Sequence, residues 1–299
     1  MGLMLPTGQP GQKGPQRPGV GGWSIIEAMT AAFGPALLFA PAHRADLIPK
    51  AHARADTVIV DLEDGAGSGD HAALRDALRG AELDPERTIL RTVGPASPYF
   101  RDDVALAREL GVGTIMVPKV GAELPAGLEG LDVIAMIETP QALANIVGIV
   151  SRAEVVGLFW GAEDLITLLG GTHSRRQADE TGAGRYRDVI RHARAQVLIH
   201  AAAAGKYAID AIHADFRDSD GQFAEALDAA RSGFLGTACI HPAQVEAVRR
   251  AYRPEAGQIS WARAVVAGAA EHTGAFQVDG MMIDAPLVSQ AERILRRAE

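Results

Sequence analysis

Ionisable residues directly follow short apolar runs at eight places in the sequence. The runs are rich in β-branched or large apolar residues and occupy 36–40, 57–60, 88–90, 114–117, 133–137, 155–160, 207–209 and 236–240. Behind them stand, in order, His43 with Arg44, Asp61 with Glu63 and Asp64, Arg91, Lys119, Glu138, Glu163 with Asp164, Asp210 with His213, and His241. If the runs are strands of a parallel barrel, their carboxyl ends share one face, so these side chains converge on a single mouth. The joint pattern predicts a functional site there.

Glu138 and Asp164 have the most specific chemistry of this set. They follow consecutive runs, and neighbouring strands lie about 4.8 Å apart. Two carboxylates that close repel each other unless they share a cation or a proton. Because the chain has one cysteine and no His-rich spacing, oxygen ligands favour Mg²⁺ or Mn²⁺ over Zn²⁺. The structural alternative is that Glu138 only pairs with Arg91 or Lys119.

Arg91 is the cation best suited to a substrate. Its planar fork matches a carboxylate or enolate oxygen, and the alternative is a salt bridge to Glu63 at the barrel mouth. Glu63 and Asp64 would position or balance such an arginine. Weaker candidates for phosphate contact are Arg44, Lys50, Arg175 and Arg176. We expect His213 and His241 to be hydrogen-bonded residues of the rim, and Cys239 to be a buried core residue.

Composition excludes several classes of function. The 299 residues carry a formal net charge of −8, whereas a nucleic-acid binder shows a basic face. No apolar run approaches the roughly 20 residues of a membrane span, and the N-terminus has no apolar core of a secretory signal. A single cysteine excludes an intramolecular disulfide. We therefore expect a cytoplasmic protein that binds neither nucleic acid nor membrane.

Alternation of the apolar runs with helical patterns predicts an α/β fold. The runs lack polar alternation, as strands covered on both faces do. Helices are expected over 70–80, 97–111, 185–205 and 219–233, and one with Thr139 as N-cap before Pro140. Eight strand–helix units predict a (β/α)₈ barrel over 23–253, between a flexible arm at 1–22 and a helical extension at 254–299. A doubly wound open sheet is the alternative, but the first run lacks its Gly-rich fingerprint.

Seven motifs in order resemble those of a known family. The chain is similar to the citrate lyase beta subunit and malyl-CoA lyase group of the HpcH/HpaI aldolase superfamily, especially to its stand-alone citrate-lyase-beta-like proteins. The resemblance covers nearly everything after the arm. The motifs lie at 38–44, 61–65, 117–119, 137–140, 161–165, 239–242 and 282–286.

The resemblance implies a reaction. It is the Mg²⁺-dependent retro-aldol cleavage of a hydroxyacyl-coenzyme A thioester, such as malyl-CoA or citramalyl-CoA, to an acyl-CoA and an α-keto acid, or the reverse condensation. Mn²⁺ is an alternative metal. The site residues implied by the matching motifs are Glu138 and Asp164 as metal ligands, Arg91 at the substrate carboxyl or carbonyl end, Glu63 and Asp64 supporting that arginine and metal-bound water, Lys119 in substrate binding, and Arg44 towards coenzyme A.

The resemblance also implies an assembly. Asp284 would be the acid/base, carried by a C-terminal segment that covers a neighbouring subunit's mouth, in a homotrimer or a hexamer of two trimers. Two departures leave the substrate open: Gln141-Ala142, where a small residue is frequent, and Thr92-Val93-Gly94, where many relatives carry Asn. The alternatives are a class II aldolase acting on free pyruvate without coenzyme A, and a non-catalytic citrate-lyase-like subunit. A phosphate-sugar barrel enzyme is disfavoured by the acidic stretch 210–220.

Overall fold

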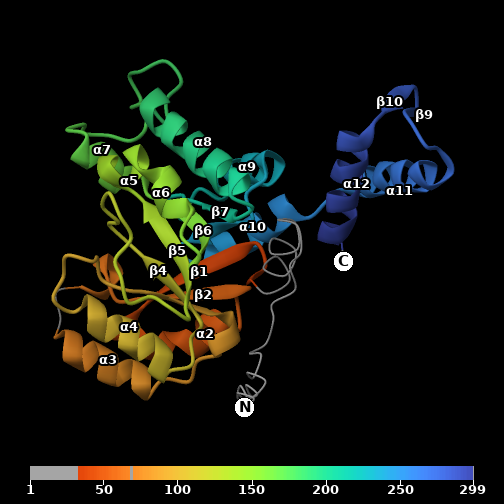
Figure 1. Ribbon diagram of the computed structural model, residues 1–299. Helices are drawn as coiled ribbons and strands as arrows, with labels where there is room; N and C mark the ends of the chain where they lie inside the picture. The colour runs from red at the N-terminus through yellow and green to blue at the C-terminus, as the bar shows by residue number, and fades with distance from the viewer. Residues whose placement is uncertain (1–32, 68–69, 299) are drawn as a thin grey trace, which may run out of the picture.

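Eight parallel strands close into a barrel in sequence order (Figure 1). The computed structural model describes residues 33–67 and 70–298. The strands are β1 (Ala36–Pro41), β2 (Thr57–Asp61), β3 (Thr88–Arg91), β4 (Thr114–Val117), β5 (Asp132–Ile137), β6 (Val155–Trp160), β7 (Tyr207–Asp210) and β8 (Gly236–Cys239). Because β8 pairs with β1, the sheet has no edge. The predicted (β/α)₈ barrel is confirmed, and the open doubly wound sheet is excluded.

Helices connect the strands and cover the outside of the barrel. They are α2 (Ile48–His52), α3 (His71–Arg79), α4 (Phe100–Glu109), α5 (Pro140–Ala144), α6 (Ile146–Val150), α7 (Ala162–Leu168), α8 (Asp188–Ala203), α9 (Ser219–Ser232) and α10 (Val245–Tyr252), with 3₁₀ turns η1 (Ala42–Leu47), η2 (Asp64–Ala66), η3 (Pro85–Arg87) and η4 (Pro242–Gln244). The Thr139 hydroxyl accepts a bond from the backbone N–H of Ala142, as expected of an N-cap. None of the helices in the described ranges is long and apolar enough to cross a membrane.

Two apolar layers explain why the strand sequences lack alternation. One layer fills the barrel and includes Leu37, Ile59, Ile89 and Phe159. The other, larger layer lies between the strands and the surrounding helices. Each strand therefore buries both faces, which fixes the strand ends and the positions of the side chains that follow them.

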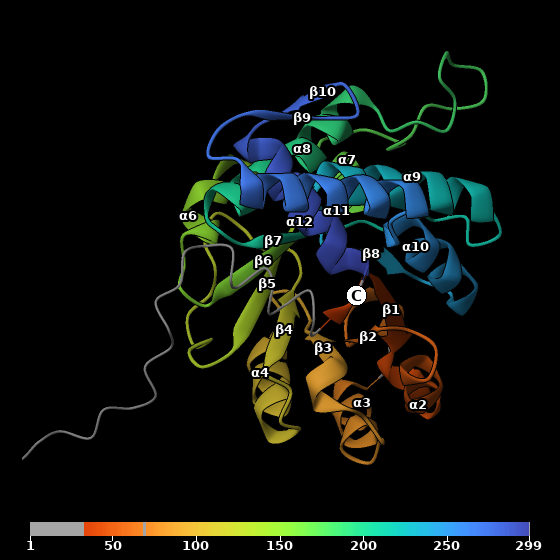
Figure 2. The same cartoon turned by 90° about the vertical axis from the view of Figure 1, so that its right-hand side faces the viewer.

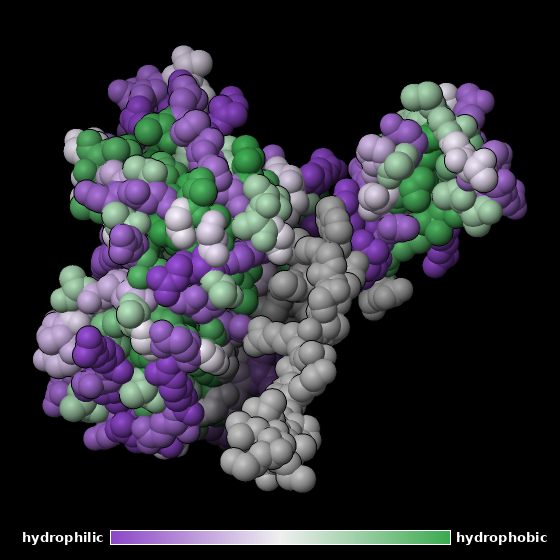
Figure 3. Space-filling model, viewed as in Figure 1, coloured by the Kyte–Doolittle hydropathy of each residue, from purple (hydrophilic) through white to green (hydrophobic). Residues whose placement is uncertain are grey.

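A C-terminal extension projects from the barrel (Figures 1 and 2). It consists of α11 (Ala256–Glu271), the antiparallel hairpin β9 (Phe276–Val278) and β10 (Met281–Ile283), and α12 (Ala285–Ala298). Its fully buried apolar residues form a small core of their own: Ala262, Val265, Ile283 and Ala291. Figure 3 shows a strip of hydrophobic residues on its surface. The sequence predicts helices and a turn here, and that turn proves to be a hairpin. The predicted arm at 1–22 lies outside the described residues.

Arg297 joins the extension to the barrel. Its guanidinium donates to the carbonyl oxygens of Ala230 and Phe234, at 2.8 and 3.4 Å. These carbonyls lie at the end of α9 and just before β8. The attachment is therefore at the amino ends of the strands, on the face opposite the mouth.

Candidate active site at the barrel mouth

A buried ion pair between Asp61 and Arg91 lies at the ends of β2 and β3. The two residues are register partners in the sheet, and Arg91 donates from Nε and Nη2 to the two oxygens of Asp61, each at 2.6 Å. Asp61 also accepts the backbone N–H groups of Glu63 and Gly65 at 2.9 Å. Burial disfavours the Arg91 charge, but the hydrogen bonds to Asp61 together with the negative charges of Asp61, Glu63 and Glu138 outweigh burial and raise the arginine pKa. The guanidinium is therefore a fixed cation at the mouth.

The motifs predict that Glu63 and Asp64 support Arg91, whereas its main partner is Asp61. Glu63 does contribute, because its Oε2 lies 3.1 Å from Arg91 Nη1. Asp64, by contrast, is 62% exposed and contacts Lys119. The missed signal was positional: Asp61 and Arg91 are both the last residues of adjacent strands.

Lys119 crosses the mouth from the loop after β4. Its ammonium group donates to Glu63 and, at 3.1 Å, to Asp64. Burial opposes the Lys119 charge, but the hydrogen bonds to these two carboxylates together with their negative charges outweigh burial and raise the lysine pKa. Burial also raises the pKa of Glu63, against the opposing effect of Lys119 and Arg91. Glu63 is thus shared between two cations.

Glu138 is the most deeply placed carboxylate of the mouth. It directly follows β5, is 2% exposed, and accepts the backbone N–H of Lys119 on Oε1 at 2.6 Å. Burial, and then the negative charges of Asp164 and Glu63, raise its pKa to about 7 against the opposing Lys119 bond. Gly161 makes room for it, since a Cβ there would lie 2.6 Å from Glu138 Oε2. The described residues do not form the alternative Glu138 ion pair with Arg91 or Lys119, because the hydrogen bond that Glu138 accepts comes from a backbone amide.

Asp164 lies in the first turn of α7 and is partly exposed. Among the described residues, no hydrogen bond or ion pair engages its carboxylate. Glu138 and Asp164 are therefore two interacting oxygen donors with remaining capacity. The described ranges contain no group of three or more His, Cys, Asp or Glu side chains poised to hold a metal. Two carboxylates fit Mg²⁺, which binds through one or two of them and keeps further positions for water and substrate.

The basic residues proposed for phosphate contact differ in availability. Arg44 is half exposed and pairs with its neighbour Asp46 at 2.9 Å, and Lys50 is exposed. Arg175 pairs with Glu225 and lies 3.8 Å from the Tyr186 ring centroid. Its guanidinium is thus already engaged within the chain. Arg176 likewise donates to Thr181 and Asp188, as its hydrogen bonds of 3.1 and 3.3 Å record.

Three further ionisable residues at the strand ends, His213, His241 and Asp210, have structural partners. His213 Nδ1 lies 2.9 Å from Glu225, and that hydrogen bond raises the histidine pKa. His241 accepts the backbone N–H of Ala243 and caps η4. Asp210 accepts from Arg194 and Trp160. The two histidines are hydrogen-bonded as expected, and Cys239 is buried.

Asp284 is the predicted site residue that the single chain does not bring to the mouth. It directly follows β10, within the extension that projects from the barrel in Figure 1. Its exposed side chain accepts the backbone N–H of Leu287 at 3.4 Å, at the start of α12. Beside it, Met281 and Met282 are 54% and 67% exposed. The extension therefore presents an exposed carboxylate and two exposed apolar side chains.

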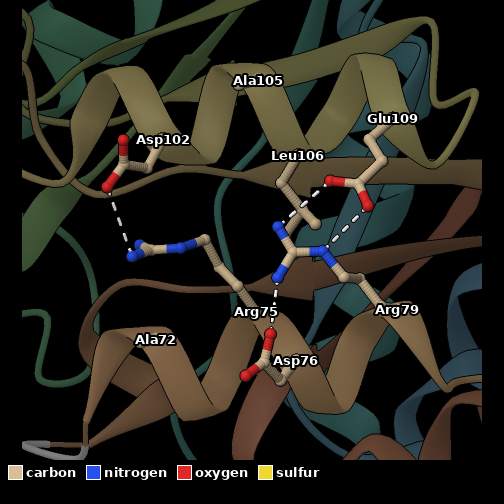
Figure 4. A pocket seen from close by; sticks show the side chains of 8 residues that line it. All are labelled: Ala72, Arg75, Asp76, Arg79, Asp102, Ala105, Leu106 and Glu109. Carbon is tan, nitrogen blue, oxygen red and sulfur yellow. Dashed lines mark hydrogen bonds and ion pairs between the residues drawn. The ribbon is translucent and has the colours of Figure 1, made fainter.

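A second hollow, of about 300 Å³, lies on the outer surface between α3 and α4 (Figure 4). Arg75 pairs there with Asp102, and Arg79 with Asp76 and Glu109. Both arginines are engaged in ion pairs, and none of the mouth residues lines the hollow. The ion pairs of Arg75 with Asp102 and of Arg79 with Glu109 connect α3 to α4, so these side chains hold two helices together and are not free for a reaction.

Comparison with known proteins agrees with this geometry. The fold defines a (β/α)₈-barrel protein, and its mouth carries acidic residues and a buried arginine. The sequence model of the HpcH/HpaI aldolase/citrate lyase family matches residues 36–130 and 127–242. The chain belongs to this family.

Two kinds of relative are informative. A citrate lyase subunit beta-like protein of Mycobacterium tuberculosis is 46% identical over 269 residues, covering 89% of this chain and 96% of the relative. Mitochondrial citramalyl-CoA lyase of Homo sapiens is 28% identical over 298 residues, covering 88% and 85%. The crystal structure of CitE from M. tuberculosis with magnesium, acetoacetate and coenzyme A superposes with a TM-score of 0.80, at 44% identity over 89% of this chain and 98% of that one.

Proposed function

We propose that the protein is a Mg²⁺-dependent carbon–carbon lyase that cleaves a short hydroxyacyl-coenzyme A, such as citramalyl-CoA or malyl-CoA, into an acyl-CoA and an α-keto acid. The observation that carries the proposal is the buried Glu138 carboxylate. It is repelled by the negative charge of Asp164 and attracted by the fixed Arg91 cation. Support comes from related M. tuberculosis structures that contain magnesium with coenzyme A and acetoacetate, or with pyruvate. The reverse condensation uses the same groups.

Glu138 and Asp164 would hold the metal. Their oxygen donors and mutual repulsion suit a divalent cation. When bound, Mg²⁺ would supply Lewis-acid polarisation of the substrate oxygens. Glu138 would remain ionised beside the cation, because a positive charge lowers the carboxylate pKa. Gly161 leaves the space that lets this carboxylate stand at the mouth.

Arg91 would orient the substrate and stabilise the charge that develops during cleavage. The bond between the carbinol carbon and the carbon next to the thioester breaks, the hydroxyl proton passes to solvent water as the keto acid forms, and the electron pair of the broken bond passes to the acyl-CoA fragment as an enolate. A preorganised guanidinium lowers the energy of such charge without rearranging. Asp61 holds the guanidinium by two bonds of 2.6 Å, and Glu63 would support the same arrangement together with Asp64. Lys119 and Arg44 are further proposed contacts, Arg44 towards coenzyme A.

Asp284 would deliver the proton to the acyl-CoA carbon from a neighbouring subunit. Its own chain carries it outward on the extension, and the exposed Met281 and Met282 give that surface an apolar character suited to an interface. We therefore propose a homotrimer or hexamer in which each extension covers the next barrel mouth. The same carboxylate would remove the proton in the condensation direction.

The first experiment incubates the full chain with separate malyl-CoA and citramalyl-CoA isomers and Mg²⁺, with and without EDTA. Released keto acid is trapped as its hydrazone: glyoxylate identifies malyl-CoA and pyruvate identifies citramalyl-CoA. We expect release that EDTA abolishes, and that Asp164→Ala eliminates. Turnover of free pyruvate with an aldehyde, without any CoA ester cleavage, would replace the proposal with a class II aldolase. Absence of every turnover would favour a non-catalytic subunit.

A further inference from the structure

Lys119 adopts a backbone conformation that is costly for its residue type. Its φ is 51°, and the only other described non-glycine residue with positive φ is Asp279, in the turn of the β9–β10 hairpin. A side chain with a Cβ is sterically disfavoured in this left-handed region. Such a conformation persists where the surrounding contacts determine it, and these positions cluster at functional sites.

Two sets of contacts hold Lys119 in place. At one end, its ammonium reaches Glu63 and Asp64 in the loop after β2. At the other end, its backbone N–H donates to Glu138 Oε1 at 2.6 Å. The next residue is also tied down, because the Thr139 hydroxyl donates to the Val120 carbonyl at 2.7 Å. One residue therefore links the acidic β2 loop to the deepest carboxylate of the mouth.

Resting on the proposed function, we infer that Lys119 is a positioning residue for the divalent-cation site. Its ion pairs with Glu63 and Asp64 hold the backbone in the left-handed conformation. That conformation aims the Lys119 amide at Glu138 and fixes the carboxylate that would bind the cation. The side chain thus acts on the metal site through its own main chain, in addition to any contact with substrate.

The experiment separates side chain from backbone by measuring Mn²⁺ binding to the full chain, without substrate, by titration calorimetry. Lys119→Ala and Lys119→Gly both remove the ammonium charge and its repulsion of a cation, but only glycine adopts positive φ freely. We expect the alanine variant to bind Mn²⁺ about 10-fold more weakly than the glycine variant, because the unanchored alanine pays the left-handed penalty. Lys119→Arg restores the anchor and should bind within about threefold of the wild type.

The Mn²⁺ affinities of the variants test the positioning role of Lys119, and that of the wild type tests the proposed metal site. Equal Mn²⁺ affinity of the alanine and glycine variants would overturn the inference, as would an arginine variant as weak as alanine. A wild type that does not bind Mn²⁺ would refute the proposed metal site and this inference with it. Thermal unfolding checks that each variant folds. If Lys119→Ala does not fold, Lys119→Asn and Lys119→Gln provide a second pair, equal in charge, in which Asn tolerates positive φ better.

Discussion

Replacing Asp61 with Asn tests whether the buried Asp61–Arg91 pair holds the mouth together. The amide keeps one oxygen acceptor but loses the negative charge, so two ionic bonds of 2.6 Å become at most one bond from the guanidinium to a neutral acceptor. A hydrogen bond to a charged group contributes about 1.5–3 kcal/mol. Glu63, 3.1 Å from Arg91, compensates in part. We expect Asp61→Asn to lower the free energy of unfolding by about 2–3 kcal/mol, which is less than the roughly 3–5 kcal/mol of a fully broken buried pair because Glu63 still faces the guanidinium.

Differential scanning calorimetry measures this effect as a fall in Tm of about 5–10 °C, taking roughly 2–4 °C per kcal/mol. Asp64→Asn is the matched control, because Asp64 is exposed and its pair with Lys119 is partly solvated. An exposed pair contributes about 1 kcal/mol or less. A double-mutant cycle with Arg91→Met should then give a coupling energy of about 2 kcal/mol. If Asp61→Asn melted no lower than the Asp64→Asn control, the argument for a stabilising buried pair would be refuted.

Three further predictions concern the metal site and the assembly. Gly161→Ala places a Cβ 2.6 Å from Glu138 Oε2, so Mn²⁺ affinity measured by calorimetry should fall about 10-fold or more, and unchanged affinity would contradict the packing argument. The Glu138 pKa of about 7 lies above its ordinary value, so a proton competes with the cation below pH 7. Mg²⁺ affinity measured from pH 8 to pH 5 should be level above the pKa and fall about tenfold per pH unit well below it, whereas a flat profile would exclude Glu138 as ligand. Asp284→Asn and Glu138→Gln should each be inactive alone, but after joint unfolding and reassembly the mixture should recover about a quarter of wild-type activity, as sites shared across a subunit interface require. No recovery would place both groups in one chain's site.

Most of the barrel could be predicted because its strands bury both faces. Their continuous apolar runs mark the strands. The residue after each run lies at the mouth because the carboxyl ends of the strands share that face, so this assignment needs no knowledge of side-chain conformation. Helix starts were less certain. The pattern over 97–111 predicts a helix, yet α4 begins at Phe100, because Ser97 and its neighbours form a turn in which the Phe100 amide donates to the Ser97 carbonyl.

The partners inside the mouth could not be predicted from the sequence. Three acidic residues lie near Arg91, at the end of β2 and in the loop that follows it. Only the strand register decides that Asp61 accepts the two shortest hydrogen bonds from Arg91. The amide bond from Lys119 to Glu138 depends on a positive φ that lysine rarely adopts. Such contacts depend on main-chain geometry, which the residue types do not encode locally. The residues themselves were identified, but which of them pair was not.

The small core of the C-terminal extension has a consequence for how the protein responds to dilution. Four fully buried apolar residues stabilise residues 256–298 weakly compared with the layers of the barrel, so this segment should open locally at a much lower free energy than the barrel unfolds. If the extension completes a neighbouring site, association supplies the stability that its own core lacks, and protomer concentration sets the fraction of complete sites. Dilution should then remove activity while the barrel stays folded.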